Sequence, residues 1–274
     1  MFERARKIHR ERGMVNLVIS SLDLLHDRLS SSSYDASDLY WHVRGGTQEF
    51  HVGDISAVFD AKPDRGGRLL RWRIDSEYGM LQHLLENLRS DDVFYDIGAS
   101  LGIHSVFAAQ RLSEGEVIAF EPSPENFEQL LTNIAHNDVA VRPVQLALSN
   151  STGTVAFDET SESIGVEGTD PSGGTVQTVD GDAYVSASDF PGPDVVKIDV
   201  EGAEPLVLQG LERTLSETDC RTVYCEVHLP ADHRPSVETY GWTATEVIRY
   251  LSDLGYAIEV LQNRDREVHL VGER

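Results

Sequence analysis

The stretch VFYDIGASLGIH, residues 93–104, decides the fold of this chain. Its apolar start, Val93–Ile97, is typical of a short strand that is buried on both faces of a parallel sheet. Gly98 and Gly102 then allow a tight turn, and a helical pattern begins at Ile103. A strand, a glycine turn and a helix in this order form the first unit of a doubly wound sheet, and they predict a small-molecule site at the turn.

Two acids indicate which kind of ligand this turn binds. Asp96 stands two residues before Gly98, whereas the dinucleotide pattern G-x-G-x-x-G usually lacks that acid and spaces its glycines differently. A carboxylate suits a cationic amino or sulfonium group better than a pyrophosphate. Glu121 ends the next predicted strand, nineteen residues after Gly102, where its carboxylate can accept both hydroxyls of a ribose. Glycines that only mark a turn are the alternative interpretation.

Apolar and amphipathic runs alternate around this turn. Further strand patterns occur at residues 116–120, 141–146, 195–198, 222–227, 257–261 and 267–271. Helical patterns lie before or between most of them, at residues 78–88, 103–112, 124–137, 203–215 and 243–254. Because no helix separates the last two strands, we expect them to pair as an antiparallel hairpin at one edge. The pattern predicts an α/β fold with a doubly wound sheet.

Two segments lie outside this alternation. Residues 1–77 are predicted to form an extension before a main domain at residues 78–274, with an amphipathic helix over residues 14–29. Basic residues precede that helix, so weak contact with a membrane surface or a protein partner is one interpretation, and a packed helix is the other. A small β-meander is expected next, with strands at residues 39–43, 49–52 and 56–59 and a turn at Gly45-Gly46. Residues 158–182 are predicted to form a long surface loop, either a flexible acidic segment or a substrate lid.

The composition is that of an acidic globular protein. The chain has 274 residues, 23 basic residues against 46 acidic ones, and a formal net charge of −23. A charge of this sign disfavours nucleic acid as a partner, and together with only three lysines it is typical of proteins from salt-accumulating, halophilic cells. Cys220 and Cys225 match neither a zinc site nor a disulfide framework, so we expect buried thiols. No apolar run is long enough for a membrane span, and a cytoplasmic location is the expectation.

A second acidic stretch, KIDVEGAE at residues 197–204, ends the predicted strand 195–198 and begins a helix. Lys197 and Asp199 share one face of the strand end, and Asp199 and Glu201 reach the crevice at the carboxyl edge of the sheet. Acids are also favoured by the helix dipole in a first helical turn, which is the alternative for Glu201 and Glu204. A substrate is therefore expected beside Asp199.

The strand predicted at residues 222–227 has one polar face, formed by Tyr224, Glu226 and His228. Glu226 and His228 are expected to form an acid–base pair, since a histidine oriented by a carboxylate can remove a proton near neutral pH. A hydrogen-bonded structural histidine is the alternative. Asp199, Glu226 and His228 also suit Mg²⁺ or Mn²⁺, but these groups have equally good roles without an ion, and no metal is predicted. His104 is expected to have a positional role.

Four motifs occur in order over residues 78–230, namely DIGASLGIHS, FEPSPENFEQLLTN, LALSN and KIDVEGAE. Together they resemble the FkbM-type family of S-adenosylmethionine-dependent class I methyltransferases. The resemblance implies a Rossmann-like seven-stranded sheet and S-adenosyl-L-methionine as the cofactor. It also implies that the glycine turn holds the methionine part, that the acid after the second strand holds the ribose, and that the loop after the third strand borders the adenine. The residues matched to these roles are Asp96, Gly98, Ala99 and Gly102, then Glu121, Pro122 and Ser123, and then Ala147.

The predicted activity is methyl transfer to oxygen, onto a hydroxyl or carboxyl group of a small molecule or glycan. The predicted catalytic residues are Lys197, Asp199, Glu226 and His228. Because no lysine or arginine lies between Arg142 and Lys197, a neutral or singly charged acceptor such as a sugar unit fits better than a nucleic acid. A nicotinamide-dependent oxidoreductase, which the glycine spacing disfavours, and a non-catalytic binding or assembly module are the alternatives.

Overall fold

The computed structural model describes residues 46–61, 67–158, 163–164, 174–217, 219–231 and 234–274. The chain divides into two compact units, one formed by residues 1–50 and 58–75 and the other by residues 51–57 and 76–274. The strands β1 (Thr47–Val52) and β2 (Ile55–Asp60) form a two-stranded sheet, and the helix α3 (Gly67–Asn87) follows. These two strands match two of the three predicted for the meander. The predicted strand at residues 39–43 and the helix at residues 14–29 lie outside the described residues.

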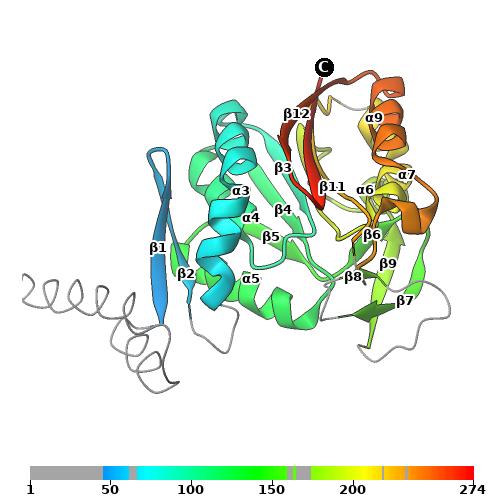
Figure 1. The fold of residues 1–274 in the computed structure, drawn as a ribbon. Coiled ribbons are helices and arrows are strands. Elements are labelled where there is room, and N and C mark those ends of the chain that lie inside the picture. The colour runs from blue at the N-terminus through cyan, green and yellow to red at the C-terminus, as the bar shows by residue number, and fades with distance from the viewer. Residues whose placement is uncertain (1–45, 62–66, 159–162, 165–173, 218, 232–233) are drawn as a thin grey trace, which may run out of the picture. The chain divides into compact units, whose positions relative to one another are not determined.

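A seven-stranded sheet forms the centre of the second unit, in the order β12-β13-β11-β10-β3-β4-β5 (Figure 1). Its strands are β3 (Val93–Ile97), β4 (Glu116–Phe120), β5 (Val141–Val144), β10 (Val195–Ile198), β11 (Thr222–His228), β12 (Ala257–Asn263) and β13 (Glu267–Glu273). The last two strands pair in antiparallel fashion, as predicted, and β13 also pairs antiparallel with β11. The last strand of the chain is therefore inserted between β11 and β12, and the sequence pattern had not indicated this position.

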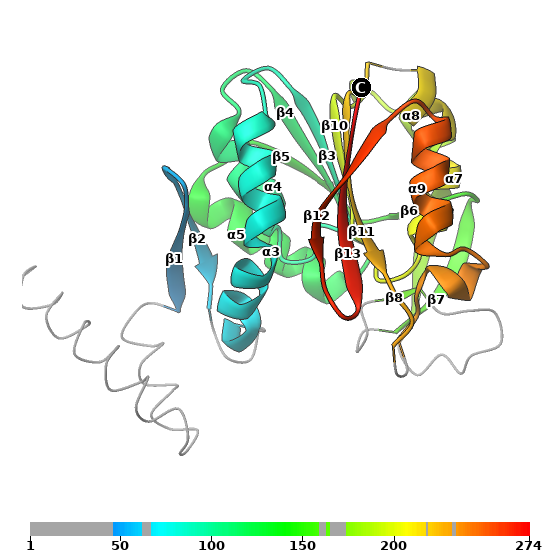
Figure 2. The same cartoon turned by 45° about the horizontal axis from the view of Figure 1, so that its top comes forward.

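Helices cover both faces of this sheet (Figures 1 and 2). They are α4 (Ile103–Arg111) and α5 (Pro124–Asn137) on one face, and α6 (Gly181–Ala187), α7 (Glu204–Gly210), α8 (Glu212–Glu217) and α9 (Ala244–Asp253) on the other. The single helix predicted over residues 203–215 is wrong, because α7 ends at Gly210 and α8 begins at Glu212. Gly210 packs so closely on another segment that a Cβ there would lie 1.9 Å from the backbone oxygen of Ser149.

A second, four-stranded sheet has the order β6-β9-β7-β8. Its strands are β6 (Ala147–Ser149), β7 (Gly153–Asp158), β8 (Ser163–Ile164) and β9 (Thr175–Asp180). The prediction of one loop over residues 158–182 is therefore wrong at both ends, while residues 159–162 and 165–173 lie outside the described part. Val176 and Thr178 alternate inward in β9 and are buried, a period of two that the many small polar and acidic neighbours had hidden.

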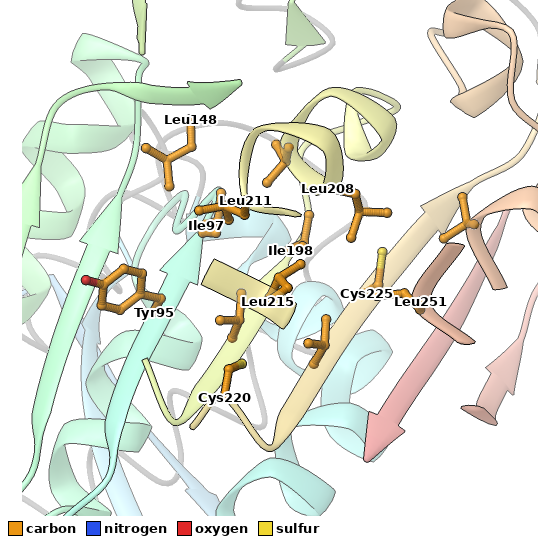
Figure 3. Close-up of a cluster of buried hydrophobic side chains, with 14 of the residues drawn as sticks. Tyr95, Ile97, Leu148, Ile198, Leu208, Leu211, Leu215, Cys220, Cys225 and Leu251 are labelled. Carbon is orange, nitrogen blue, oxygen red and sulfur yellow. The ribbon is translucent and has the colours of Figure 1, made fainter. Parts of the chain in front are cut away.

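A core cluster of buried apolar side chains lies between the seven-stranded sheet and the helices α7, α8 and α9 (Figure 3). Ile97 and Ile198 contribute from the strands, and Leu208 and Leu211 contribute from the helical side. Cys220 and Cys225 are free, buried thiols, as predicted. Within the described part of the chain, no helix has both the length and the apolar character needed to cross a membrane.

Candidate active site

The strand order reverses at the carboxyl ends of β3 and β10. The chain runs from β3 outward to β4 and β5 and then returns to β10 on the other side of β3, and ligands of doubly wound sheets bind where the order reverses in this way. Gly98 follows β3 and Asp199 follows β10. The Asp199 backbone N–H donates to the oxygen of Ile97 at 3.0 Å, so these two segments meet directly at the switch point.

The glycine turn has a left-handed backbone at Gly98, Ser100 and Gly102. A Cβ on Gly98 would lie 1.8 Å from the Asp199 backbone oxygen, so this glycine is required by packing against β10 as well as by its φ of 78°. A Cβ on Gly102 would lie 2.5 Å from the side chain of Leu130. The sequence predicted a turn and a ligand site at these glycines, and it did not indicate their contacts within the protein.

Lys197 and Asp96 lie beneath the turn, enclosed by protein. The Lys197 Nζ lies 3.2 Å from the Gly98 backbone oxygen, 3.3 Å from an Asp96 carboxylate oxygen and 3.2 Å from Asp199 Oδ2, and its side chain is 3% exposed. The fully buried Asp96 also accepts a hydrogen bond from Ser105 Oγ at 2.6 Å. Burial lowers the pKa of Lys197, but Asp96 and Asp199 outweigh it and raise this pKa, so the lysine is charged. Lys197, which the sequence analysis names among the candidate catalytic residues, therefore ties the two strand ends together and is enclosed by protein oxygens.

Glu121 lies directly after β4, next to the glycine turn. One carboxylate oxygen accepts the backbone N–H of Ser100 at 2.7 Å, and the other accepts that of Ser123 at 2.8 Å. Since a carboxylate oxygen can accept more than one hydrogen bond, a group oriented in this way is of the type that binds a ribose diol. Ser123 itself caps α5, with Oγ accepting from the Asn126 N–H at 3.3 Å.

The remaining residues predicted for the cofactor lie in the glycine turn, after β4 and in β6. Gly98, Ser100 and Pro122 are partly exposed, whereas Ala99 is 5% exposed. Ala147 lies in β6, packs in a small buried cluster and is 6% exposed. An open left-handed turn beside a fixed carboxylate, with an acidic strand end opposite, fits a cofactor that combines a ribose with a positive charge.

His228 ends β11 within a group of carboxylates. Its Nδ1 lies 2.8 Å from Glu204 Oε1, and its Nε2 lies 3.4 Å from Glu201, 3.9 Å from Glu226 and 4.0 Å from Asp199. Glu204 is fully buried and also accepts the Gly202 N–H at 2.9 Å. We call these four acids together with His228 the acceptor-side cluster.

The carboxylate that orients His228 is Glu204, at 2.8 Å. The predicted partner Glu226 lies farther from the imidazole, at 3.9 Å. An oxygen of Glu226 instead lies 3.3 Å from Nε2 of His269, a buried residue of β13 that the sequence analysis did not single out. Sequence reasoning assigned Glu204 to the first turn of a helix, which is also correct. Nothing local in the chain signals its contact with a residue twenty-four positions later. His104 is buried, and its Nδ1 lies 3.2 Å from Glu77.

Carboxylates dominate the protonation of the two buried histidines. Burial lowers the pKa of His228, but Glu204 and the neighbouring acids outweigh burial and hold this pKa well above 6.5. Burial also lowers the pKa of His269, yet its contacts with Glu226 and Glu267 raise it to about 9. Burial and the charge of Asp199 raise the pKa of Glu226. The site thus balances several buried acids with protonated imidazoles.

Two overlapping groups in the described part of the chain have the donor types of a metal site. They are Asp199, Glu226 and His228, and Glu226, Glu267 and His269, each with ligand atoms within 4.8 Å of one another. Carboxylate oxygens with one imidazole suit a divalent ion. The same atoms are also accounted for by charge balance with protonated histidines, and the prediction of a metal-free site stays a prediction.

The strand order, the glycine turn and the acid after β4 define an S-adenosylmethionine-dependent class I methyltransferase. Residues 96–258 match the methyltransferase FkbM domain, and the chain belongs to this family. The family and the cofactor expected from the four motifs are confirmed, and the oxidoreductase and the non-catalytic module are set aside.

Two similar proteins are themselves methyltransferases. Hexuronic acid methyltransferase AglP of Haloferax volcanii is 30% identical over 245 residues, which cover 87% of this chain and 90% of that protein. Methyltransferase sdnD of Sordaria araneosa is 28% identical over 190 residues, which cover 56% and 73%. Among solved structures, the precorrin-6y C5,15-methyltransferase of Geobacter metallireducens matches with 16% identity and a TM-score of 0.47, covering 72% of this chain and 88% of that one.

Proposed function

We propose that the protein methylates an oxygen atom of a sugar, with a hexuronic acid unit in a glycan or small molecule as the acceptor. The observation that carries this proposal is the His228–Glu204 hydrogen bond of 2.8 Å at the end of β11. It orients an imidazole in a site that is otherwise made of carboxylates, which is the arrangement that removal of a hydroxyl proton requires. The similarity to a hexuronic acid methyltransferase over 87% of the chain supports the acceptor class.

The residues of the site have separate proposed roles in cofactor binding and in positioning of the strand ends. S-adenosylmethionine, when bound, supplies a methyl group on a positively charged sulfur that an acceptor oxygen can displace in line. Asp96, Gly98, Ala99 and Gly102 of the turn, Glu121 with Pro122 and Ser123, and Ala147 are the residues we assign to holding it. Lys197 is a positioning residue, since its three oxygen contacts set the separation of the β3 and β10 ends. Exact placement of the two reacting groups supplies much of the rate of such a displacement.

His228 is the proposed base. In its neutral form, with Nδ1–H donating to Glu204, His228 would use the lone pair of Nε2 to accept the proton of an acceptor hydroxyl. Asp199, Glu201 and Glu226 surround Nε2 and stabilise the imidazolium that results. The raised pKa of His228 favours a second candidate reaction, esterification of the sugar carboxylate, because a protonated imidazole binds an anion and no base is needed.

Calorimetry tests the cofactor part of this proposal. S-adenosylmethionine and S-adenosylhomocysteine are titrated into the wild type, Glu121→Ala and Glu125→Ala, in KCl-containing buffer that suits an acidic protein. Glu125 is an exposed acid in the first turn of α5 and serves as the matched control. We expect binding of both ligands to be lost only in Glu121→Ala, and equal affinity in all three proteins would remove Glu121 from the cofactor site.

Labelled methyl transfer to glucuronic acid and to glucose tests the acceptor part. The product is then treated with mild alkali, which cleaves a methyl ester and leaves a methyl ether intact. An alkali-stable product supports the hydroxyl reaction with His228 as base, and an alkali-labile product supports esterification. No transfer to either sugar in a protein that binds the cofactor would refute a sugar acceptor.

A further inference from the structure

An acidic sugar needs a positive charge at a site that is lined by carboxylates. Lys197 cannot supply it, because its side chain is 3% exposed and its ammonium group is surrounded by three protein oxygens. Arg264, in the turn between β12 and β13, is paired with Glu267 and also donates to Gln262. Arg213 and Arg221 contact Asp182 and Asp92, which lie away from the acceptor-side cluster.

Arg234 differs from these cations in its position and exposure. It follows β11 by six residues, its side chain is 55% exposed, and its Nη1 lies 3.9 Å from Glu201 Oε2. The same Glu201 oxygen lies 3.4 Å from His228 Nε2. A continuous line of polar atoms therefore leads from the imidazole through Glu201 to the guanidinium group. At 3.9 Å and half exposed, the Arg234–Glu201 pair is a loose one, which leaves most guanidinium donors open to another anion.

The backbone holds Arg234 at this place. Gly202 packs on the residue after Arg234 so closely that a Cβ on Gly202 would lie 2.6 Å from the Pro235 backbone carbon. The φ of Gly202 is 100°, a left-handed conformation that keeps this close approach open. Because Gly202 directly follows Glu201, the contact sets the loop with Arg234 against the acceptor-side cluster.

We propose that Arg234 binds the carboxylate of an acidic sugar acceptor and so sets the preference for uronic acids over neutral sugars. This inference rests on the proposed sugar acceptor and goes beyond it by assigning the residue that recognises the acid. A guanidinium group suits the task because its planar donors can bind both oxygens of one carboxylate. Glu201 then gives up its loose pairing to the incoming anion.

The test compares Arg234→Gln with two controls. Arg249→Gln removes an exposed arginine from α9. Arg266→Gln removes an exposed arginine from the turn between β12 and β13, and the backbone oxygen of Arg266 accepts the Leu229 N–H at 2.8 Å. Binding of sodium glucuronate and of glucose to the protein saturated with S-adenosylhomocysteine is measured by calorimetry. Methylation of both sugars is measured in parallel, at the lowest KCl concentration that keeps the protein folded, since salt screens exposed charges.

We expect the ratio of glucuronate affinity to glucose affinity to fall about tenfold in Arg234→Gln, because this variant loses a hydrogen bond between two charged groups. In both controls the ratio should stay within about twofold of the wild type. An equal ratio in Arg234→Gln and the wild type overturns the inference, as does a tenfold loss in Arg266→Gln instead. If glucuronate binds in an Arg234-dependent way but is not methylated, the proposed reaction fails and the inference stands. If the wild type does not bind glucuronate, the inference fails.

Discussion

Replacing Gly98 with alanine tests the contact that joins the ends of β3 and β10 in the candidate active site. The new Cβ would lie 1.8 Å from the Asp199 backbone oxygen and 2.8 Å from its carbonyl carbon. Gly241→Ala is the matched control, because Gly241 has a φ of 76°, close to the 78° of Gly98, and a Cβ there meets nothing within 4 Å.

The difference between the two variants isolates the cost of the clash. Both pay for a left-handed non-glycine residue, about 1–2 kcal/mol. Only Gly98→Ala must also move the end of β3 from the end of β10 by about 1.6 Å, from the 1.8 Å of the clash to the 3.4 Å at which ordinary contact begins. Overpacking of a tight interior costs about 1–3 kcal/mol in addition, so we expect a total of about 2–5 kcal/mol for Gly98→Ala.

Denaturant unfolding measures the two free energies, and calorimetry with S-adenosylhomocysteine measures the consequence for binding. We expect Gly98→Ala to weaken binding by at least about tenfold, because separating the strand ends displaces Asp199 and the turn together. The control should bind like the wild type. Equal destabilisation in both variants, with binding retained, would refute the argument that Gly98 is needed for contact with Asp199.

Three further predictions concern protonation, charge and metal. If neutral His228 is the base, the rate should rise with pH, and the midpoint of this rise should lie above pH 6.5 because the pKa of His228 is raised. Glu204→Gln removes the main charge that raises the pKa of His228, so the midpoint should move to lower pH. An unchanged midpoint would rule out the orienting role of Glu204. Lys197→Met leaves Asp96 and Asp199 without their cation and should lower the free energy of unfolding by about 3–5 kcal/mol. Denaturant unfolding measures this loss, and Arg249→Met is the exposed control. A loss near zero in Lys197→Met would contradict a stabilising buried ion pair. Methyl transfer should be insensitive to EDTA in steady-state assays, whereas inhibition that Mg²⁺ reverses would assign the acceptor-side cluster to an ion.

Local patterns predicted the parts of the fold that local physics governs. The bounds of β3, β4 and β10 agree with the predicted strands, because each is a short apolar run between polar turns. The site's position followed from the same reasoning, since a glycine turn after β3 and acids after β4 and β10 must meet at one edge of a parallel sheet. β9 was missed because its two buried residues alternate with polar ones in an acidic, glycine-rich stretch.

The sequence by itself determined the α/β class, the glycine turn, the acids at the strand ends and the negative charge, since these depend on residues that are neighbours in the chain. Only the tertiary structure decided that Glu204 orients His228, that Lys197 is enclosed, and that β13 enters the sheet beside β11. Each of these depends on a contact between segments far apart in the chain. Such a contact forms when the whole sheet and its helices pack. Hydrophobic periodicity within one segment predicts which face is buried, but it does not predict which distant residue that face contacts.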